Sequence, residues 1–289
     1  MTALLHAARP GRGRATSRGA RGLARGIGGG AGTAVAAAVL IVALAAALAP
    51  GLFTSQDPTV GSHEPLAAPS LENWFGTDAV GRDLYTRVVY GARESLLGAV
   101  TAVAVGLVAG TLLGAVAGSA RGWVDAVIMR AVDVLLAVPS LLLSLSVIIL
   151  LGFGTWNAAL AVGVTSVATF ARLARSQVLG VAASDFVEAA YGSGASRGQV
   201  LVRHILPNSL APVIGLAAVQ FGSALLQLAT LGFLGYGAPP PTPEWGLLIA
   251  EARDHIATAW WLTILPGLVI VAVVVAANHL SQRIQEGYR

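Results

Sequence analysis

Apolar residues occur in six long runs, and the polar segments between them hold most of the charged side chains. A bilayer core of about 30 Å is crossed by a helix of roughly 20 apolar residues, and each run is close to that length. The pattern therefore predicts an all-α integral membrane protein with six transmembrane helices. The predicted spans are, in chain order, Thr33–Phe53, Leu96–Ala120, Val132–Leu151, Asn157–Val178, Leu210–Leu234 and Trp260–Asn278.

The polar segments alternate in their arginine content, which predicts the orientation. The first 32 residues contain six arginines and no acidic residue. Because cytoplasmic flanks of membrane helices are enriched in positive charge, this segment is expected in the cytoplasm, and six spans then place both termini there. Residues 1–32 are expected to be a disordered Arg/Gly-rich tail beside anionic lipid, with no nucleic-acid partner. Residues 33–289 form the transmembrane domain, with extracytoplasmic segments at about 54–95 and 236–259.

A cleavable signal is the alternative for the first span. The sequence Ala47–Ala49 resembles a signal-peptidase site, and cleavage there would leave five spans. Against it, the preceding apolar run exceeds the usual length of about 7–15 residues, and Pro50 would follow the cut.

The composition excludes several chemistries. Only 11% of the residues are charged, and all 18 basic residues are arginine. Without lysine the chain cannot hold a standard P-loop, in which a lysine contacts the nucleotide phosphates. Without cysteine it has no thiol nucleophile and no thiolate metal site. The sequence GASRG (Gly194–Gly198) matches the nucleophile-elbow pattern, but its helical setting lacks the strand that such an elbow requires.

A charged, glycine-punctuated segment separates the fourth and fifth runs. Asp185 and Glu188 have the spacing of a capping box, with Asp185 as the N-cap of a short helix. Gly192 or Gly194 is suited to the turn that ends this helix.

A second short helix is predicted directly after this turn. Ser196 and Gln199 repeat the capping-box spacing. Arg203 and His204 fall in the last turn, where positive charge favours the helix dipole, and Pro207 is expected to stop the helix.

Ala189 and Ala190 give the first short helix a small face that can sit deep in a partner's groove. The alternative is an amphipathic loop lying on the lipid surface. Residue physics alone leaves both interpretations open.

Small residues recur every four positions in the second run, which lets two helix backbones approach closely in lipid. Such a stripe serves either a sliding interface or static packing. Its members are Gly98, Ala102, Gly106, Gly110, Gly114 and Gly118.

Two glutamines lie inside the fifth run. Gln220 and Gln227 are seven positions apart and share one helix face, so they either line a pathway or form interhelical hydrogen bonds. Near the start of the third run, Arg130 and Asp133 are expected to be interfacial structure.

The outer segments carry charged residues at helical spacing. Asp78/Arg82 and Asp83/Arg87 are acid-before-base pairs at i, i+4, and an architectural role is favoured for them. In the last outer segment, one histidine and two carboxylates are expected on one face of an interfacial helix. No metal site is expected from so small a set, which is Glu251, Asp254 and His255.

Three stretches resemble the dipeptide/oligopeptide/nickel branch of ABC-importer permeases. Glu188-Ala189-Ala190, Gly194 and His204–Asn208 resemble the EAA motif. Phe75–Leu96 resembles the FGTD-x-x-GRD signature, and Leu231–Asp254 the FLG-x-G…PPTP-x-WG segment. The order and spacing are most similar to the C-type subunit of this branch over roughly residues 35–280. The C-terminal sequence HLSQRIQEGYR departs from the family pattern.

The resemblance implies a type I ABC-importer permease fold with a cytoplasmic coupling helix in an EAA loop at 184–208. It implies a multi-pass protein of the bacterial cytoplasmic membrane that imports di- or oligopeptides. Nickel chelates, glutathione and other peptide-like solutes are alternative substrates, and a non-transporting membrane scaffold is the alternative function.

The resemblance also implies partners: a homologous permease subunit in a heterodimer, two ATPase subunits, an extracytoplasmic binding protein and membrane lipid. ATP and Mg are expected in the ATPases, so this chain needs no cofactor and is not an enzyme. The implied ATPase-coupling residues are Glu188, Ala189, Ala190, Gly194, Ala195, Ser196, Arg197, Arg203, His204, Leu206 and Pro207. The implied extracytoplasmic signature is Gly76, Thr77, Asp78, Gly81, Arg82 and Asp83.

Overall fold

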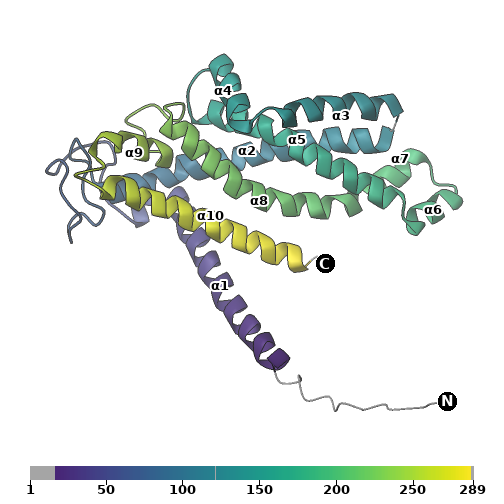
Figure 1. Ribbon diagram of the computed structural model, residues 1–289, viewed down its shortest axis with the longest axis horizontal. Helices are drawn as coiled ribbons and strands as arrows, with labels where there is room; N and C mark the ends of the chain where they lie inside the picture. The colour runs from purple at the N-terminus through teal and green to yellow at the C-terminus, as the bar shows by residue number, and fades with distance from the viewer. Residues whose placement is uncertain (1–16, 121, 288–289) are drawn as a thin grey trace, which may run out of the picture.

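The structure is a computed structural model that describes the backbone of residues 17–120 and 122–287. Apart from one isolated bridge between Thr77 and Asp83, these residues form helices, turns and loops (Figure 1). The elements are α1 (Ser17–Leu48), η1 (Pro50–Leu52), α2 (Leu84–Ala120), α3 (Gly122–Ala137), α4 (Ser140–Leu151), α5 (Thr155–Ala182), α6 (Asp185–Gly192), α7 (Arg197–Val200), η2 (Leu201–Ile205), α8 (Leu206–Phe233), α9 (Trp245–Glu251), η3 (Arg253–His255) and α10 (Trp261–Gly287).

The number of membrane spans agrees with the sequence prediction when one broken span is counted. Within the described residues, five helices are long and apolar enough to cross a membrane, and α3 with α4 makes a sixth if this bent pair is one span. The prediction of an all-helical membrane protein is confirmed.

The third predicted span, Val132–Leu151, is not one straight helix. The axes of α3 and α4 differ by 99°. The break precedes Pro139, which is the N-cap of α4. A proline disfavours the helical conformation of the residue before it, so Val138 is not helical and α3 ends at Ala137.

Several helices extend beyond their apolar runs. α1 begins at Ser17, inside the stretch predicted as a disordered tail, while residues 1–16 lie outside the described part of the chain. α2 has 37 residues. At 1.5 Å per residue it is about 55 Å long, so it projects beyond a hydrocarbon core of about 30 Å.

The glycine stripe of α2 brings its backbone against α5. A Cβ atom on Gly110 would lie 2.5 Å from the Cβ of Phe170, and one on Gly118 would lie 2.8 Å from Val178. Neither position has room for a side chain, which confirms the close approach predicted from the spacing.

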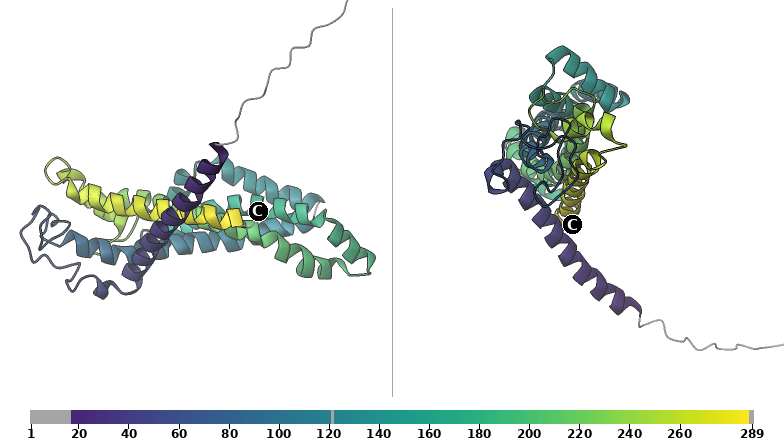
Figure 2. Two further views of the ribbon diagram at one scale, coloured as in Figure 1. Left: turned by 90° about the horizontal axis from the view of Figure 1, so that it is seen from below. Right: turned by 90° about the vertical axis from the view of Figure 1, so that its left-hand side faces the viewer.

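The two ends of the helix bundle are built differently (Figure 1). The loop before α2 and helix α9 lie together at one end (residues 53–83 and 244–259), which is called here the outer cap after the side of the membrane predicted for it. Helices α6 and α7 lie at the opposite end. Figure 2 shows α1 crossing the bundle obliquely, so that its N-terminal part stands away from the other helices.

Candidate coupling loop and outer cap

Helix α6 starts one position earlier than the sequence predicted. Its N-cap is Ser184, not Asp185, and no side chain caps the helix. The hydroxyl of Ser184 donates instead to the carbonyl of Val181 at 2.6 Å, in the turn after α5. The predicted capping box of Asp185 and Glu188 is therefore wrong, and both acids lie in the first turn of α6.

The turn after α6 depends on Gly194, which has a φ of +85°. Its N–H donates to the carbonyl of Tyr191 at 3.0 Å, and the N–H of Ala195 donates to Ala190 at 3.2 Å. The second capping box is confirmed: Ser196 accepts from the N–H of Gln199, whose side chain accepts from the N–H of Ser196.

The prediction that Pro207 stops the second helix is wrong. α7 continues through η2, a single π-helical stretch, directly into α8, and Pro207 lies in the first turn of α8. The wider π-helical turn accommodates a proline, which cannot donate an i→i−4 bond and would clash with that carbonyl. Arg203 and His204 therefore lie within a continuous helical path from the loop into the membrane.

A small apolar cluster joins this loop to the membrane helices. Partly buried side chains of α2, α6 and α8 pack on it, including Ala115, Ala190 and Leu206. Through Ala115, Val178 and Leu206 the loop is thus fixed to the long helices α2, α5 and α8. The buried members of this apolar cluster are Val178, Val187, Val200 and Ile205.

The exposed surface of the loop differs from the predicted small face. Glu188 and Ala189 are exposed, but Ala190 is turned toward the apolar cluster. Phe186 and Tyr191 are 48% and 44% exposed and flank the EAA residues. Sequence reasoning missed these two, although an aromatic on each side of the motif was a readable signal.

The other predicted coupling residues are distributed over the same surface. Gly194, Ser196, Arg197, Arg203 and Pro207 are exposed, while Ala195, His204 and Leu206 are half-buried. Among the described residues, neither Arg197 nor Arg203 forms a salt bridge.

In the outer cap the signature residues build a tight turn structure. Gly76 and Gly81 have φ values of +73° and +79°. The buried hydroxyl of Thr77 donates to the carbonyl of Glu64 at 2.6 Å and accepts from the N–H of Ala67 at 2.8 Å. Asp83 accepts from the N–H of Thr86 at 2.7 Å, at the start of α2.

Asp78 is the centre of a charged network in this cap. Its carboxylate accepts from Arg82 Nε at 2.6 Å. Burial would raise the pKa of Asp78, but the N–H groups of Arg82 and Val80 and the guanidinium of Arg82 outweigh burial and lower it. The Asp78/Arg82 pair is therefore present, although it lies in a turn and not on a helix.

The second predicted pair, Asp83 with Arg87, does not form. Arg87 is fully buried, and its Nη1 donates to Asp78 Oδ2 at 2.8 Å and to Glu251 Oε2 at 2.6 Å. Asp83 is turned to the helix N-terminus instead. The i, i+4 spacing predicted the wrong pair because Asp78 and Glu251, brought together by the packing of the cap, bond Arg87 instead of Asp83.

Glu251, Asp254 and His255 do not share one face. Glu251 ends α9 and points to Arg87, whereas the side chain of Asp254 is 81% exposed and lies in η3. Among the residues that the structure describes, no three metal-ligating side chains come together.

Helix α9 is held at its other end by Trp245 and Glu244. The indole N–H of Trp245 donates to the carbonyl of Val88 at 2.9 Å. The backbone N–H of Trp245 donates to the hydroxyl of Ser95 at 3.1 Å. Glu244 accepts from the N–H groups of Gly246 and Leu247, and burial raises its pKa to about 7.

Inside the membrane helices, Gln227 donates to the hydroxyl of Ser144 at 2.8 Å. This is the interhelical hydrogen bond that the sequence left as one of two alternatives. The side chain of Gln220 is half-buried and forms no hydrogen bond within the described residues. Ser223, one turn further along the same side of α8, is exposed. Of the charged pair near the third span, Asp133 bonds Arg172 of α5 at 2.5 Å.

Comparison with known proteins gives consistent matches. Residues 110–286 match the family described as binding-protein-dependent transport system inner membrane component. The chain is 42% identical over 221 residues to the dipeptide transport system permease protein DppC of Alkalihalophilus pseudofirmus, covering 76% of this chain and 73% of that protein. It is 39% identical over 237 residues to the probable D,D-dipeptide transport system permease protein DdpC of Escherichia coli, covering 79% and 80%.

A third relative is the glutathione transport system permease protein GsiD of Shigella sonnei, 43% identical over 218 residues, with 75% of this chain and 72% of that protein covered. Among solved structures, the match to a chain of the inward-facing MetNI methionine ABC transporter covers 68% of this chain and 96% of that chain, with a TM-score of 0.54 and 16% identity. An amino acid ABC transporter matches 70% and 92%, with a TM-score of 0.52 and 17% identity. These structures support the fold.

Proposed function

Because the chain belongs to the family of binding-protein-dependent transport system inner membrane components, we propose that it is the permease subunit of an ABC importer for short peptides. The relatives named for dipeptides, D,D-dipeptides and glutathione support a peptide substrate. Nickel chelates and other peptide-like solutes are the alternative cargo.

The energy comes from partner subunits, since a chain without lysine has no standard P-loop. Two ATPase subunits bind ATP and Mg and dock on α6 and α7. A homologous permease completes the pathway as a heterodimer, and an extracytoplasmic binding protein delivers the peptide. Both termini lie in the cytoplasm of the bacterial cell, and this chain catalyses no reaction itself.

The continuity of α7, η2 and α8 carries the proposal. A force on the exposed loop surface reaches α8 without a break in the helical path, and it reaches α5 and α2 through the cluster around Val187 and Val200. Docked ATPases can therefore move membrane helices as rigid bodies. The exposed Phe186, Ala189 and Tyr191 supply the packing area, while Arg197 and Arg203 are free to pair with acids on the ATPase.

The outer cap has an architectural role in this mechanism. It clamps α9 to the outer part of α2 through Glu251 and Trp245, so the two elements move together. Gln220 on α8 lines the pathway, since an unpaired amide inside the membrane is unfavourable against lipid. Gln227 is committed to Ser144 and holds α8 against α4.

The test is uptake of labelled di-, tri- and pentapeptides and of nickel in a strain that lacks this chain. Peptide uptake should return with the wild type and with the control Gly180→Val, which has open space around it, but not with Gly194→Val, whose positive φ disfavours a side chain. If the strain that lacks this chain loses only nickel uptake, the permease function stands and the proposed peptide substrate is wrong. No change for any solute would favour the non-transporting scaffold.

A further inference from the structure

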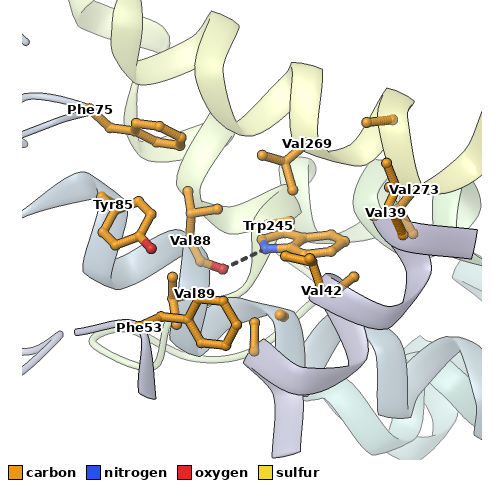
Figure 3. Close-up of a pocket in the computed structure, with 15 residues that line it drawn as sticks. Val39, Val42, Phe53, Phe75, Tyr85, Val88, Val89, Trp245, Val269 and Val273 are labelled. Atoms are coloured by element: carbon orange, nitrogen blue, oxygen red, sulfur yellow. Dashed lines mark hydrogen bonds between the residues drawn. The ribbon is translucent and has the colours of Figure 1, made fainter. Parts of the chain in front are cut away.

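An apolar cavity of about 390 Å³ lies between α1, α2 and α10 at the outer end of the bundle. Figure 3 shows the indole of Trp245 inside it, with Val269 on one side and Val42 on the other. Phe53, Phe75 and Tyr85 close the end toward the outer cap. Volumes of 300–1,000 Å³ are typical of small-molecule sites.

The cavity exists because alanines face one another where three helices meet. Short side chains from α1, α2 and α10 leave a gap that the aromatic residues only partly fill. Five of the 15 lining residues are alanines: Ala38, Ala43, Ala46, Ala92 and Ala272.

The lining offers almost no polar group. The indole N–H of Trp245 is committed to Val88, which leaves the hydroxyl of Tyr85 as the polar side-chain group among the lining residues. An apolar cavity of this kind does not hold ordered water. A peptide with charged termini would lose its hydration there without any replacement.

The cavity opens sideways. Ala38 and Val42 of α1 and Ala272 of α10 line it and are also exposed on the outside of the helices. The exposed neighbours Val35, Ile41 and Val271 are apolar, so the opening continues onto a surface suited to hydrocarbon. A molecule from the bilayer can enter without crossing a polar layer.

An aromatic group marks the level of the membrane surface at the closed end. The ring of Tyr85 lies 5.1 Å from that of Trp74 and 5.4 Å from that of Phe75. Tryptophan and tyrosine are enriched where membrane proteins pass through the lipid headgroups. The cavity therefore spans the hydrocarbon depth just below the headgroups of the leaflet opposite α6.

We propose that this cavity holds one acyl chain of a membrane phospholipid, with its headgroup beside Tyr85. A flexible acyl chain fits the shape and the chemistry, and it is present around the opening at high concentration. The chain would fix α1 to the bundle at the point where alanines leave its packing incomplete.

The test uses the assembled transporter in bilayer discs that contain a phospholipid with a photoreactive group in one acyl chain. After illumination, adducts are mapped by peptide mass spectrometry. The wild type should concentrate adducts on the lining segments 38–46 and 269–273. Ala272→Phe, which fills the opening, should remove them, while Val275→Phe, on the exposed side of the same helix, should leave them unchanged.

Adducts spread evenly over the outward face of α10, or adducts in the lining that survive Ala272→Phe, would overturn the proposal. So would a crosslink from Ala46→Cys to the partner permease, since Ala46 is buried in the lining and the crosslink would place a protein side chain in the cavity. If Ala272→Phe does not assemble, Ala38→Phe narrows the opening from α1 and serves the same purpose. None of these readouts depends on transport, so they stand apart from the test of peptide import.

Discussion

The guanidinium Nη1 of Arg87 lies 2.6 Å from Oε2 of Glu251, a residue 164 positions further along the chain. Arg87 is fully buried, and Asp78 completes its neutralisation. The contact joins the two outer segments and, with the bonds from Trp245 to Val88 and Ser95, fixes α9 along α2.

Removing one partner of this buried pair should destabilise the transporter. Glu251→Ala removes one of the two carboxylates that contact the buried Arg87. Because Asp78 still pairs with Arg87, the cost should lie below the about 3–5 kcal/mol of leaving a buried charge without a partner. The thermal midpoint of the purified complex should fall clearly. Arg253→Ala is the control, because its contact with Asp254 is long and exposed, and its midpoint should not move. Equal midpoints for both variants would contradict the clamp.

Glu244 should make stability depend on pH. Its folded-state pKa is about 7 against an ordinary 4.5, so the folded protein binds the proton more tightly than the unfolded chain. This contribution is full below pH 4.5 and is lost as the pH rises to 7. At 1.36 kcal/mol per pKa unit it amounts to roughly 3 kcal/mol.

Glu244 accepts from Gly246 at Oε1 and from Leu247 at Oε2, and Glu244→Gln keeps one of these two oxygen acceptors but does not titrate. Its thermal midpoint should therefore change less than that of the wild type between pH 5 and 7.5. The nearby acid Glu94 also raises the pKa of Glu244, so Glu94→Gln should weaken the pH dependence without abolishing it. Parallel curves for the wild type and Glu244→Gln would show that another group is responsible.

The glycine stripe should not tolerate side chains. Gly110→Val places carbon atoms against Phe170 and the backbone of α5, and overpacking of this kind costs about 1–3 kcal/mol. The yield of folded, detergent-stable protein should drop. Ala104→Val adds the same branching on the exposed side of α2 and should be neutral. A normal yield of Gly110→Val would mean that α2 and α5 are further apart.

The two glutamines of α8 should respond differently. Gln227→Leu removes the bond to Ser144, and such bonds between membrane helices average about 0.6 kcal/mol, so stability falls slightly. Gln220→Leu removes no bond and should leave stability unchanged while altering the concentration dependence of peptide uptake. Unaltered uptake in Gln220→Leu would remove this residue from the pathway.

Local signals in the sequence were sufficient for much of this architecture. Apolar runs of bilayer length predicted the spans, the spacing of Gly106–Gly118 predicted the approach of α2 to α5, and Ser196 with Gln199 predicted the start of α7. Each depends on neighbours within one or two helical turns, or on the thickness of the membrane.

The errors arose where distant segments decide the structure. Pro207 has the sequence character of a helix stop, but the π-helical stretch before it keeps the path into α8 continuous. Asp83 and Arg87 have the i, i+4 spacing of a helical ion pair, yet Arg87 donates to Glu251 and Asp78 instead. Which acid neutralises a buried arginine depends on the packing of the whole cap, and no local pattern contains that information.

The measurement closest to the central claim is the number of peptides imported per ATP hydrolysed in proteoliposomes that contain the full transporter. Wild type and Gly180→Val should give the same ratio. Gly194→Val distorts the turn between α6 and α7, so we predict continued ATP hydrolysis with little peptide import and a strongly reduced ratio. An unchanged ratio in Gly194→Val, with normal import, would show that this loop does not couple the ATPases to the membrane helices.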